Sequence, residues 1–480
     1  MNFLVIGNII GSALCLEAAL FAIPLVCALC YRESIMPFVL PAVIAAVAGS
    51  LMRVRKGEPG DMRSKEGFVS TGMTWIALSL VGMLPFIISG TLPNVCDALF
   101  ETISGFTTTG SSVIKSVEDV PKGVLMWRSF MHWIGGMGIL VFMSAIMRFT
   151  GGSQMNLMKA ESPGPVISKL VPKAGETARV QYGIYTFMTV LTTSILLLLK
   201  MPLFDAICIT FGAAGTGGFG VLNSSCAAYT PAQQVVIIVA MIAFGMNFTF
   251  YFLLLVRNWK AAFGMEEIRL YLLIIVICIT TITIDLIHQG GFTSPSWALR
   301  DAAFHVGSIM TTTGYAIDDV NQWPRLSQGI LVFLMFCGAC AGSTGGGFKI
   351  SRILLMARGF NRDMATHLRP DIVKKVHIDG KVVEENVMRS TGTYTFVYMA
   401  VTIISVLLIS IEGKDWETTF TSVVATFNNI GPGLGEVGTV GNYAGFSNFS
   451  KLILSADMLI GRLEIFPILV LFRRSTWKKF

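Results

Sequence analysis

Four short segments that end in glycine carry the polar groups from which chemistry is most readily expected. They read TTTG at 107–110, GTGG at 215–218, TTTG at 311–314 and NNIG at 428–431. Extended backbone would present successive carbonyl oxygens there, and rings of carbonyl oxygens can replace the hydration shell of a monovalent cation. Glycine provides backbone angles that are closed to other residues. The candidate cation-binding residues are Thr107, Thr108, Thr109, Gly110, Thr216, Gly217, Gly218, Thr311, Thr312, Thr313, Gly314, Asn428, Asn429, Ile430 and Gly431.

The segments recur in one frame along the chain. The first three glycines each follow an aspartate by thirteen residues, in the pairs Asp97 and Gly110, Asp205 and Gly218, and Asp301 and Gly314. The fourth copy departs at its start, where Thr418 and Thr419 occupy the frame. We expect a short helix before each segment, too short to cross a bilayer and capped by the Asp or Thr, at about 97–108, 205–216, 301–312 and 418–429.

Four copies of one polar segment predict four walls around a single axis. Backbone that is not helical is tolerated at membrane depth only where it is buried in protein or lines a water-filled cavity. Each short helix would end at its segment, so that its negative dipole end favours a cation. The alternative is that the segments are re-entrant turns whose glycines serve packing alone.

The elements that must position these segments are long apolar helices. Of the 480 residues, 53% are hydrophobic and only 14% are charged, whereas a soluble chain carries about 25% charged residues. A spanning helix needs about 20 apolar residues. This rule predicts ten crossings, at 3–30, 35–53, 67–90, 123–148, 180–200, 231–256, 267–288, 326–357, 387–411 and 450–472.

The distribution of charge predicts how these helices are oriented. Lys and Arg gather in alternate connections, such as 53–65, 148–179 and 352–389, whereas the connections that carry the glycine segments are acidic. By the positive-inside rule, the basic connections and both termini are cytoplasmic, and all four segments enter from outside. The net charge of +7 therefore reflects topology and not a nucleic-acid partner.

The combined pattern predicts an all-α polytopic membrane protein with four parallel helix–pore-loop–helix repeats around one pore, preceded by two extra transmembrane helices. Repeats of equal orientation are related by an axis along the membrane normal, whereas an inverted-repeat carrier presents its halves upside down to one another. The predicted units are the leading helix pair (1–60), repeat 1 (61–160), repeat 2 (161–262), repeat 3 with a Gly-rich broken helix (263–380) and repeat 4 (381–480).

A glycine-rich stretch at 338–348 interrupts the predicted eighth helix. Its glycines should break or kink the helix near mid-membrane, on the cytoplasmic side of the third segment, where a gate would act. The alternative is a packing seam that lets helices approach closely. The candidate gate residues are Gly342, Gly345, Gly346, Gly347, Lys349 and Arg462.

Arg462 lies midway along the last predicted helix. A charge at mid-bilayer costs roughly 2.5–3.5 kcal/mol on insertion scales, so we expect the side chain to face the cavity. There it would act as an electrostatic barrier or contact the Gly-rich stretch, and the alternative is a structural ion pair with another helix. Glu464 lies on another face of the same helix and is a poor local partner.

Three further features resemble functional motifs, but we do not expect them to bind a nucleotide or phosphate or to relay protons. The sequence GTGGFG at 215–220 fits a dinucleotide-binding pattern, but it follows a short membrane segment where that pattern requires a strand. The stretch 342–349 resembles a phosphate-binding loop, but Phe348 separates its last glycine from Lys349. His132 is more typical of packing than of a proton relay.

Together these motifs resemble the Trk/Ktr/HKT superfamily of potassium transporters over essentially the whole chain, and its bacterial Trk-type membrane subunits in particular. The leading helix pair is similar to the Trk branch, because Ktr-type subunits usually lack it. The residues that carry the likeness are SGFTTTG at 104–110, GGF at 217–219, TTTGY at 311–315, NNIGPGLG at 428–435, WRS at 127–129, WIGG at 133–136, AGSTGGG at 341–347 and GRLE at 461–464.

The resemblance implies a homodimer in which each subunit has its own pore, gated by a cytoplasmic ring of nucleotide-binding, TrkA-like regulatory subunits. The family's intramembrane gating loop matches 338–348 and its arginine in the last helix matches Arg462. In related plant transporters, Ser in place of the first filter glycine goes with sodium transport, so Gly110 implies potassium. The second loop departs most, with two more glycines than the first and third. The family's filter glycines match Gly110, Gly218, Gly314 and Gly431.

We therefore predict potassium uptake across a bacterial cytoplasmic membrane through a gated, filter-containing pore, driven by the membrane potential. Potassium would bind at the filter residues, with no covalent cofactor. An enzyme is not expected, because no nucleophile–base pair or metal-ligand set occurs at membrane depth. The alternatives are a proton- or sodium-coupled potassium symporter and a less selective potassium/sodium pathway. The predicted partners are the bilayer, a second copy and the regulatory ring, for which the basic connection 358–389 is the candidate docking surface.

Overall fold

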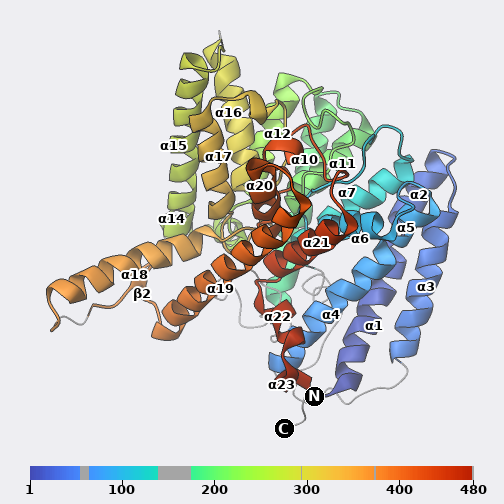
Figure 1. Ribbon diagram of the computed structural model, residues 1–480, viewed down its shortest axis with the longest axis horizontal. Helices are drawn as coiled ribbons and strands as arrows, with labels where there is room; N and C mark the ends of the chain where they lie inside the picture. The colour runs from blue at the N-terminus through green and yellow to red at the C-terminus, as the bar shows by residue number, and fades with distance from the viewer. Residues whose placement is uncertain (54–63, 139–173, 293, 372–373, 478–480) are drawn as a thin grey trace.

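The computed structural model describes residues 1–53, 64–138, 174–292, 294–371 and 374–477, and this part of the chain is mostly helical (Figure 1). Its strands β1 (His377–Ile378) and β2 (Lys381–Val382) pair in one small antiparallel hairpin. The second half of the helix predicted at 123–148 lies outside the described residues, as do parts of the basic connections at 53–65 and 148–179.

Six helical spans in the described part of the chain are long and apolar enough to cross a membrane. They are α1 with α2 (Phe3–Leu20, Ala22–Cys30), α3 (Met36–Arg53), α4 with α5 (Ser64–Gly82, Leu84–Ile88), α10 (Ala174–Leu198), α15 (Glu266–His288) and α19 (Glu385–Ile409). These spans confirm the leading helix pair and the first long helix of every predicted repeat.

The second long helix is broken in repeats 2, 3 and 4, although the sequence predicts a break only in repeat 3. There α17 (Arg325–Cys337) and α18 (Ile350–Leu368) flank the Gly-rich stretch. In repeat 2, α12 (Pro231–Phe244) and α13 (Phe248–Leu255) meet at 92°. In repeat 4, α21 (Asn448–Arg462) and α22 (Phe466–Phe472) are separate helices. The predictions of continuous helices at 231–256 and 450–472 are therefore wrong.

The residues at the two unpredicted breaks have conformations that interrupt a helix. Asn247 accepts the Thr249 N–H at 2.9 Å and so starts a new helix three residues after α12 ends. In repeat 4, Glu464 and Ile465 have positive φ values of 57° and 68°, which no α-helix accommodates. Pro467, which lacks a backbone N–H, then occupies the first turn of α22.

A short helix precedes each glycine segment, as predicted. These are α6 (Val95–Phe106), α11 (Leu203–Gly215), α16 (Pro295–Met310) and α20 (Trp416–Phe427). They begin two to six residues earlier than expected, so the predicted caps at Asp97, Asp205, Asp301 and Thr418 are wrong, and these side chains lie within the helices. Asn94 and Asp415 instead cap α6 and α20, each accepting a backbone N–H at 2.9 Å.

The short helices form a closed ring. Each packs against the second long helix of its own repeat and that of the preceding repeat: α6 with α7 (Lys122–Gly136) and α21, α11 with α12 and α7, α16 with α17 and α12, and α20 with α21 and α17. The contact between α6 and α21 joins the first predicted repeat to the last and closes the ring of helices.

Both ends of the described chain lie on one face of the helical body. The ring of Phe3 stacks on that of Trp477 with 6.4 Å between centroids, and Lys65 donates to the carbonyl of Ser475 at 3.1 Å. On another side, α18 leaves the body beside α19 and leads to the β1–β2 hairpin (Figure 1). The common face of the termini agrees with the predicted even number of crossings.

Candidate ion-conduction site

The four glycine segments, which we name loops 1 to 4 in chain order, share one backbone conformation. Their final glycines have φ values of 81°, 77°, 84° and 99° at Gly110, Gly218, Gly314 and Gly431. The residue two positions earlier is also left-handed, with φ between 54° and 61°, at Thr108, Thr216, Thr312 and Asn429. Such a conformation costs a non-glycine residue roughly 1–2 kcal/mol. Its recurrence in all four loops indicates that their surroundings impose it.

The final glycines stack on one another's loops in a closed cycle. A Cβ atom on Gly110 would lie 2.0 Å from the carbonyl oxygen of Gly217 in loop 2. One on Gly218 would lie 1.9 Å from that of Thr313 in loop 3, and one on Gly314 would lie 2.0 Å from that of Ile430 in loop 4. The cycle closes at Gly431, whose Cβ would lie 2.6 Å from the carbonyl oxygen of Thr109 in loop 1.

This cycle fixes the identity of the glycines and the order of the loops. In each case the contacted carbonyl belongs to the residue just before the next loop's final glycine, so the four contacts are equivalent. Real Cβ atoms essentially never approach within 3.0 Å, so no side chain fits at these positions. The four contacts therefore place the loops next to one another in a closed order, from loop 1 to loop 4 and back to loop 1.

Loops 1 and 3 are held by the same hydroxyl contacts. Thr107 and Thr311 donate to carbonyls one turn back in their helices, at 2.6 and 2.7 Å. Each also shares a hydrogen bond with the last threonine of its own loop, Thr109 or Thr313, at 2.8 and 2.7 Å. These hydroxyls pin the end of each short helix to its loop, so the repeated TTTG sequence has a repeated structural role.

Loop 4 replaces these hydroxyls with amides. Asn428 donates to the carbonyl of Val424 one turn back, at 2.9 Å, and accepts from the Tyr398 hydroxyl at 2.8 Å. Asn429 donates at 2.9 Å both to the Thr109 hydroxyl of loop 1 and to a carbonyl of α21. Loop 4 is thus tied directly to loop 1 at the point where the cycle closes.

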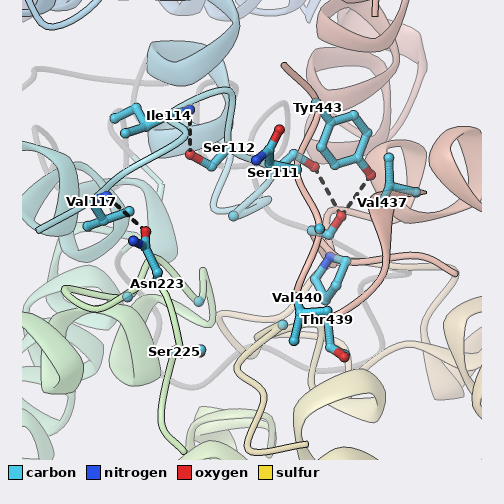
Figure 2. A pocket seen from close by; sticks show the side chains of 18 of the residues that line it. Ser111, Ser112, Ile114, Val117, Asn223, Ser225, Val437, Thr439, Val440 and Tyr443 are labelled. Carbon is cyan, nitrogen blue, oxygen red and sulfur yellow. Dashed lines mark hydrogen bonds between the residues drawn. The ribbon is translucent and has the colours of Figure 1, made fainter. Parts of the chain in front are cut away.

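A cavity of about 140 Å³ lies against the glycine cycle, and all four final glycines line it (Figure 2). Its rim is polar and comes from the segments that follow loops 1, 2 and 4. Tyr443 and Ser111 donate to the carbonyl of Gly431 at 2.8 and 3.2 Å, and the Val117 N–H donates to Asn223 at 2.9 Å (Figure 2). The last bond joins the rims of repeats 1 and 2.

A buried ion pair joins the segments that flank loops 1 and 2, and its arginine lines the cavity. Sequence reasoning does not assign this pair a role. Arg128 lies 2.6 Å from Glu101, and their side chains are 3% and 0% exposed. Arg128 also donates to the carbonyl of Gly220 at 2.9 Å and covers the ring of Phe219 at 3.5 Å. Glu101 in turn accepts the Val113 N–H at 2.9 Å. The sequence indicates this pair only through the presence of one charged residue in each of two apolar segments, Glu101 in α6 and Arg128 in α7.

His132 contacts the end of the helix before loop 1 and the residue that follows loop 2. Its Nδ1 lies 2.9 Å from the carbonyl oxygen of Gly105, and its Nε2 accepts the Phe219 N–H at 3.2 Å. The first contact requires Nδ1–H and the second an unprotonated Nε2, which is the pattern of a neutral imidazole. Because backbone groups occupy both nitrogens, His132 serves packing and loop position, as expected.

The Gly-rich stretch lies directly beneath loops 3 and 4. The Gly346 N–H donates to the Thr312 hydroxyl of loop 3 at 2.7 Å. A Cβ on Gly346 would lie 2.7 Å from the carbonyl oxygen of Asn428 in loop 4, and one on Gly345 would lie 2.9 Å from that of Thr311. We name residues 338–349 the intramembrane loop. Within it Gly342 and Gly347 have φ values of 69° and 78°, and Lys349 has 77°.

Arg462 crosses from α21 to the intramembrane loop. It is 7% exposed and donates to the carbonyl of Thr344 at 2.9 Å. It also donates to the carbonyls of Gly135 and Gly136, at the end of α7, at 2.5 and 2.6 Å. Of the alternatives drawn from sequence, the structure places Arg462 in contact with the Gly-rich stretch.

Two further charged residues, Lys349 and Arg352, lie at the end of the intramembrane loop and just after it. Lys349 is buried and donates through Nζ to the carbonyl of Gly345 within the loop. Glu464 pairs with Arg352 of α18, not with Arg462, as the helix periodicity indicates.

The elbow between α12 and α13 also receives the intramembrane loop. The Cys340 N–H donates to the Gly245 carbonyl at 3.1 Å, and the Phe248 N–H donates to the Gly342 carbonyl at 3.0 Å. The Thr344 hydroxyl donates to the last residue of α12 at 3.2 Å. The 92° bend therefore exposes backbone groups that the loop satisfies.

Comparisons with known proteins agree with this geometry. Residues 34–479 match the profile of the TrkH family, described as cation transport protein. The chain is 35% identical over 490 residues to the Trk system potassium uptake protein TrkH of Salmonella typhimurium, with both chains covered in full. It is 31% identical to TrkG of Escherichia coli, covering 95% of this chain and 94% of that one. The crystal structure of the potassium transporter TrkH from Vibrio parahaemolyticus superposes with a TM-score of 0.90 at 31% identity, with both chains covered in full.

Proposed function

Because the chain belongs to the TrkH family of cation transport proteins, we propose that it takes up potassium across the bacterial cytoplasmic membrane through a gated pore. Its relatives are named as Trk system potassium uptake proteins, which are transporters and not enzymes. The single observation that carries the proposal is the closed cycle of glycine-on-carbonyl contacts among Gly110, Gly218, Gly314 and Gly431.

Potassium would cross this cycle dehydrated. Carbonyl oxygens of the four loops would replace the water molecules around the ion. Because carbonyl groups carry no net charge, they would bind the ion weakly enough for it to leave again, as conduction requires. Each of the four short helices ends at a loop, and the partial negative charges of their C-terminal carbonyls favour a cation there. The ions would arrive through the cavity that the four glycines line.

The intramembrane loop would act as the gate. It lies against loops 3 and 4 on the side where the pore must continue, and Arg462 holds it by way of Thr344. Opening requires Arg462 to release this carbonyl and Gly346 to release Thr312. The hydrogen-bond donors of this buried arginine would hold the loop in place, and its positive charge would repel cations beneath the filter.

The driving force would be the membrane potential, which supplies about 2.3 kcal/mol per charge per 100 mV. One observation favours a second candidate, a proton-coupled symporter. Asp457 on α21 is 2% exposed, and Ser405 donates to one of its oxygens at 2.7 Å. Its other oxygen has no hydrogen-bond partner among the described residues. A buried carboxyl group of this kind can hold a proton, but it lies outside the glycine cycle.

The assembly follows from the family. We propose a homodimer with one pore in each subunit, basic connections and both termini in the cytoplasm, and a nucleotide-binding regulatory ring on that side. The candidate docking surface at 358–389 comprises part of α18, the β1–β2 hairpin and the start of α19. Its bases include Arg362, which pairs with Glu385 at 2.8 Å.

Ion-substitution flux in liposomes tests the proposal. The purified protein should carry potassium and rubidium in preference to sodium, with a current that reverses at the potassium equilibrium potential whatever the pH gradient. A reversal potential that moves with the pH gradient, and that stops moving in Asp457→Asn, would establish the symporter instead.

A further inference from the structure

The connection between repeats 2 and 3 presents a surface that the proposed pore does not use. It runs from the end of α13 through α14 (Trp259–Gly264) to the start of α15. We name residues 255–263 the boundary segment, and no acidic residue occurs in it. Its exposed side chains combine large apolar groups, between 53% and 68% exposed, with two bases: Leu255, Val256, Trp259 and Phe263, and Arg257 and Lys260.

The helices on either side of this connection, α13 and α15, meet the intramembrane loop at neighbouring residues. Phe248, where α13 begins, donates its N–H to the Gly342 carbonyl at 3.0 Å. At the other end, the buried Glu267 accepts the Ala341 N–H at 2.6 Å. The Asn247 amide lies 3.4 Å from Glu267 and links the two ends. The boundary segment is therefore connected, through α13 and the start of α15, to Ala341 and Gly342.

The position and composition of the boundary segment indicate what covers it. It lies between the bent helix pair α12–α13 and the apolar span α15, and its bases group it with the basic connections that the positive-inside rule places at the bilayer surface. Trp259 and Phe263 are four residues apart and share one face of α14, and aromatic rings prefer the interface between headgroups and acyl chains. Arg257 and Lys260 flank them, and basic side chains at this depth attract anionic headgroups.

We propose that the boundary segment binds anionic phospholipid headgroups of the cytoplasmic leaflet and thereby holds the intramembrane loop beneath the filter. The gating consequence rests on the proposed function, whereas the lipid contact does not. Removing both bases should weaken the contact about thirtyfold, because each base near an anionic surface contributes roughly fivefold.

Rubidium flux tests the gating consequence. We compare the purified protein in vesicles of phosphatidylcholine alone and in equal parts phosphatidylcholine and phosphatidylglycerol. Basal flux should be lower in the anionic vesicles, and the double variant Arg257→Gln with Lys260→Gln should restore it. The control, Arg473→Gln with Arg474→Gln, removes the same charge from exposed positions outside the candidate docking surface and should keep the lipid dependence. Equal lipid dependence in the two double variants, or none in the unmodified protein, would overturn the proposal.

Fluorescence tests the lipid contact without transport. Brominated phosphatidylglycerol should quench tryptophan emission more than brominated phosphatidylcholine does, and Trp259→Phe should remove that excess. The double variant at Arg257 and Lys260 should remove it too. If the segment instead docks a protein, Trp259 contributes no excess quenching in vesicles that hold no other protein, and the proposal fails. Excess quenching without flux in any vesicle would leave the lipid site standing and refute the proposed transport function.

Discussion

Gly110→Ser gives the most direct access to the glycine cycle. A Cβ at this position would lie 2.0 Å from the Gly217 carbonyl oxygen, and an ordinary contact is at least 3.4 Å. The carbonyl, or loop 1 itself, must therefore move by about 1.4 Å, the difference between these two distances. The φ of 81° adds the cost of a left-handed non-glycine residue, roughly 1–2 kcal/mol. The substitution therefore removes one carbonyl from its place in the ring.

The loss of one ion–carbonyl contact sets the expected size of the effect. A hydrogen bond to a charged group contributes about 1.5–3 kcal/mol, and a comparable ion–dipole contact corresponds to roughly 10- to 100-fold in potassium preference. We expect the sodium-to-potassium flux ratio in liposomes to rise by that factor while flux persists. The assay is rubidium and sodium uptake at matched protein amounts under a fixed potassium gradient.

Gly90→Ser is the matched control. Gly90 has a φ of 75°, close to that of Gly110, but apart from its chain neighbours no heavy atom of the described residues lies within 4 Å of the point that a Cβ would occupy. It therefore bears the same backbone strain without the collision and should leave the flux ratio unchanged. A second comparison is Gly431→Ala, whose Cβ would meet a carbonyl at 2.6 Å and should change the ratio less than Gly218→Ala, at 1.9 Å. An unchanged ratio in Gly110→Ser with normal potassium flux would refute the carbonyl ring.

Three further predictions follow from the supports of the loops. Arg462→Ala should raise basal rubidium flux several-fold, because it releases the intramembrane loop; a fall in flux would show that Arg462 is structural. Glu101→Gln breaks the buried ion pair with Arg128 and should lower the free energy of unfolding by about 3–5 kcal/mol. Thermal stability in detergent measures this loss, and an unchanged stability would contradict the structural role of the ion pair. Asp415→Ala removes the cap of α20 and should cost about 1 kcal/mol. Hydrogen bonds from the side chain and backbone of Thr418 hold the pKa of Asp415 below its ordinary value. This stabilisation is therefore complete above the unfolded-state pKa of about 4 and is lost as the pH falls through the lower folded-state pKa. The stabilities of the variant and of the unmodified protein should therefore become equal in acid. A difference in stability that persists in acid would contradict the assignment of Asp415 as the cap.

The loops and the first long helices could be predicted because their signals are local. A left-handed glycine at the end of a polar tetrapeptide is a property of a few residues, and its fourfold repetition excludes coincidence. The spans α1–α2, α3, α4–α5, α10, α15 and α19 are continuous apolar runs that hydropathy detects directly. The break at 338–349 was also local, since four glycines in six residues (342–347) weaken a helix strongly.

The other breaks could not be predicted because their causes lie elsewhere in the chain. Hydropathy reports that 231–256 is apolar, but the bend at Gly245 exposes a carbonyl that only Cys340, almost a hundred residues later, satisfies among the described residues. Similarly, the sequence left Arg462 with three possible roles, because its acceptors at Gly135 and Thr344 come from two other repeats. Periodicity describes one helix at a time, whereas these contacts depend on how four repeats close.

The four loops differ in sequence because one of their side chains makes a different contact in each loop. The position two residues before each final glycine is left-handed in all four, but its side chain does different work in each. Thr216 binds within its own loop at 2.6 Å, Thr312 accepts from the intramembrane loop, and Asn429 reaches loop 1. In loop 1, Thr108 has a buried hydroxyl without a hydrogen-bond partner among the described residues. The backbone thus has the same conformation in all four loops, while the side chains differ: Asn429 ties loop 4 to loop 1, and Thr312 ties loop 3 to the intramembrane loop. If the proposed filter and gate are correct, they meet at Thr312, where loss of the contact with Gly346 would free a filter residue without altering the glycine cycle.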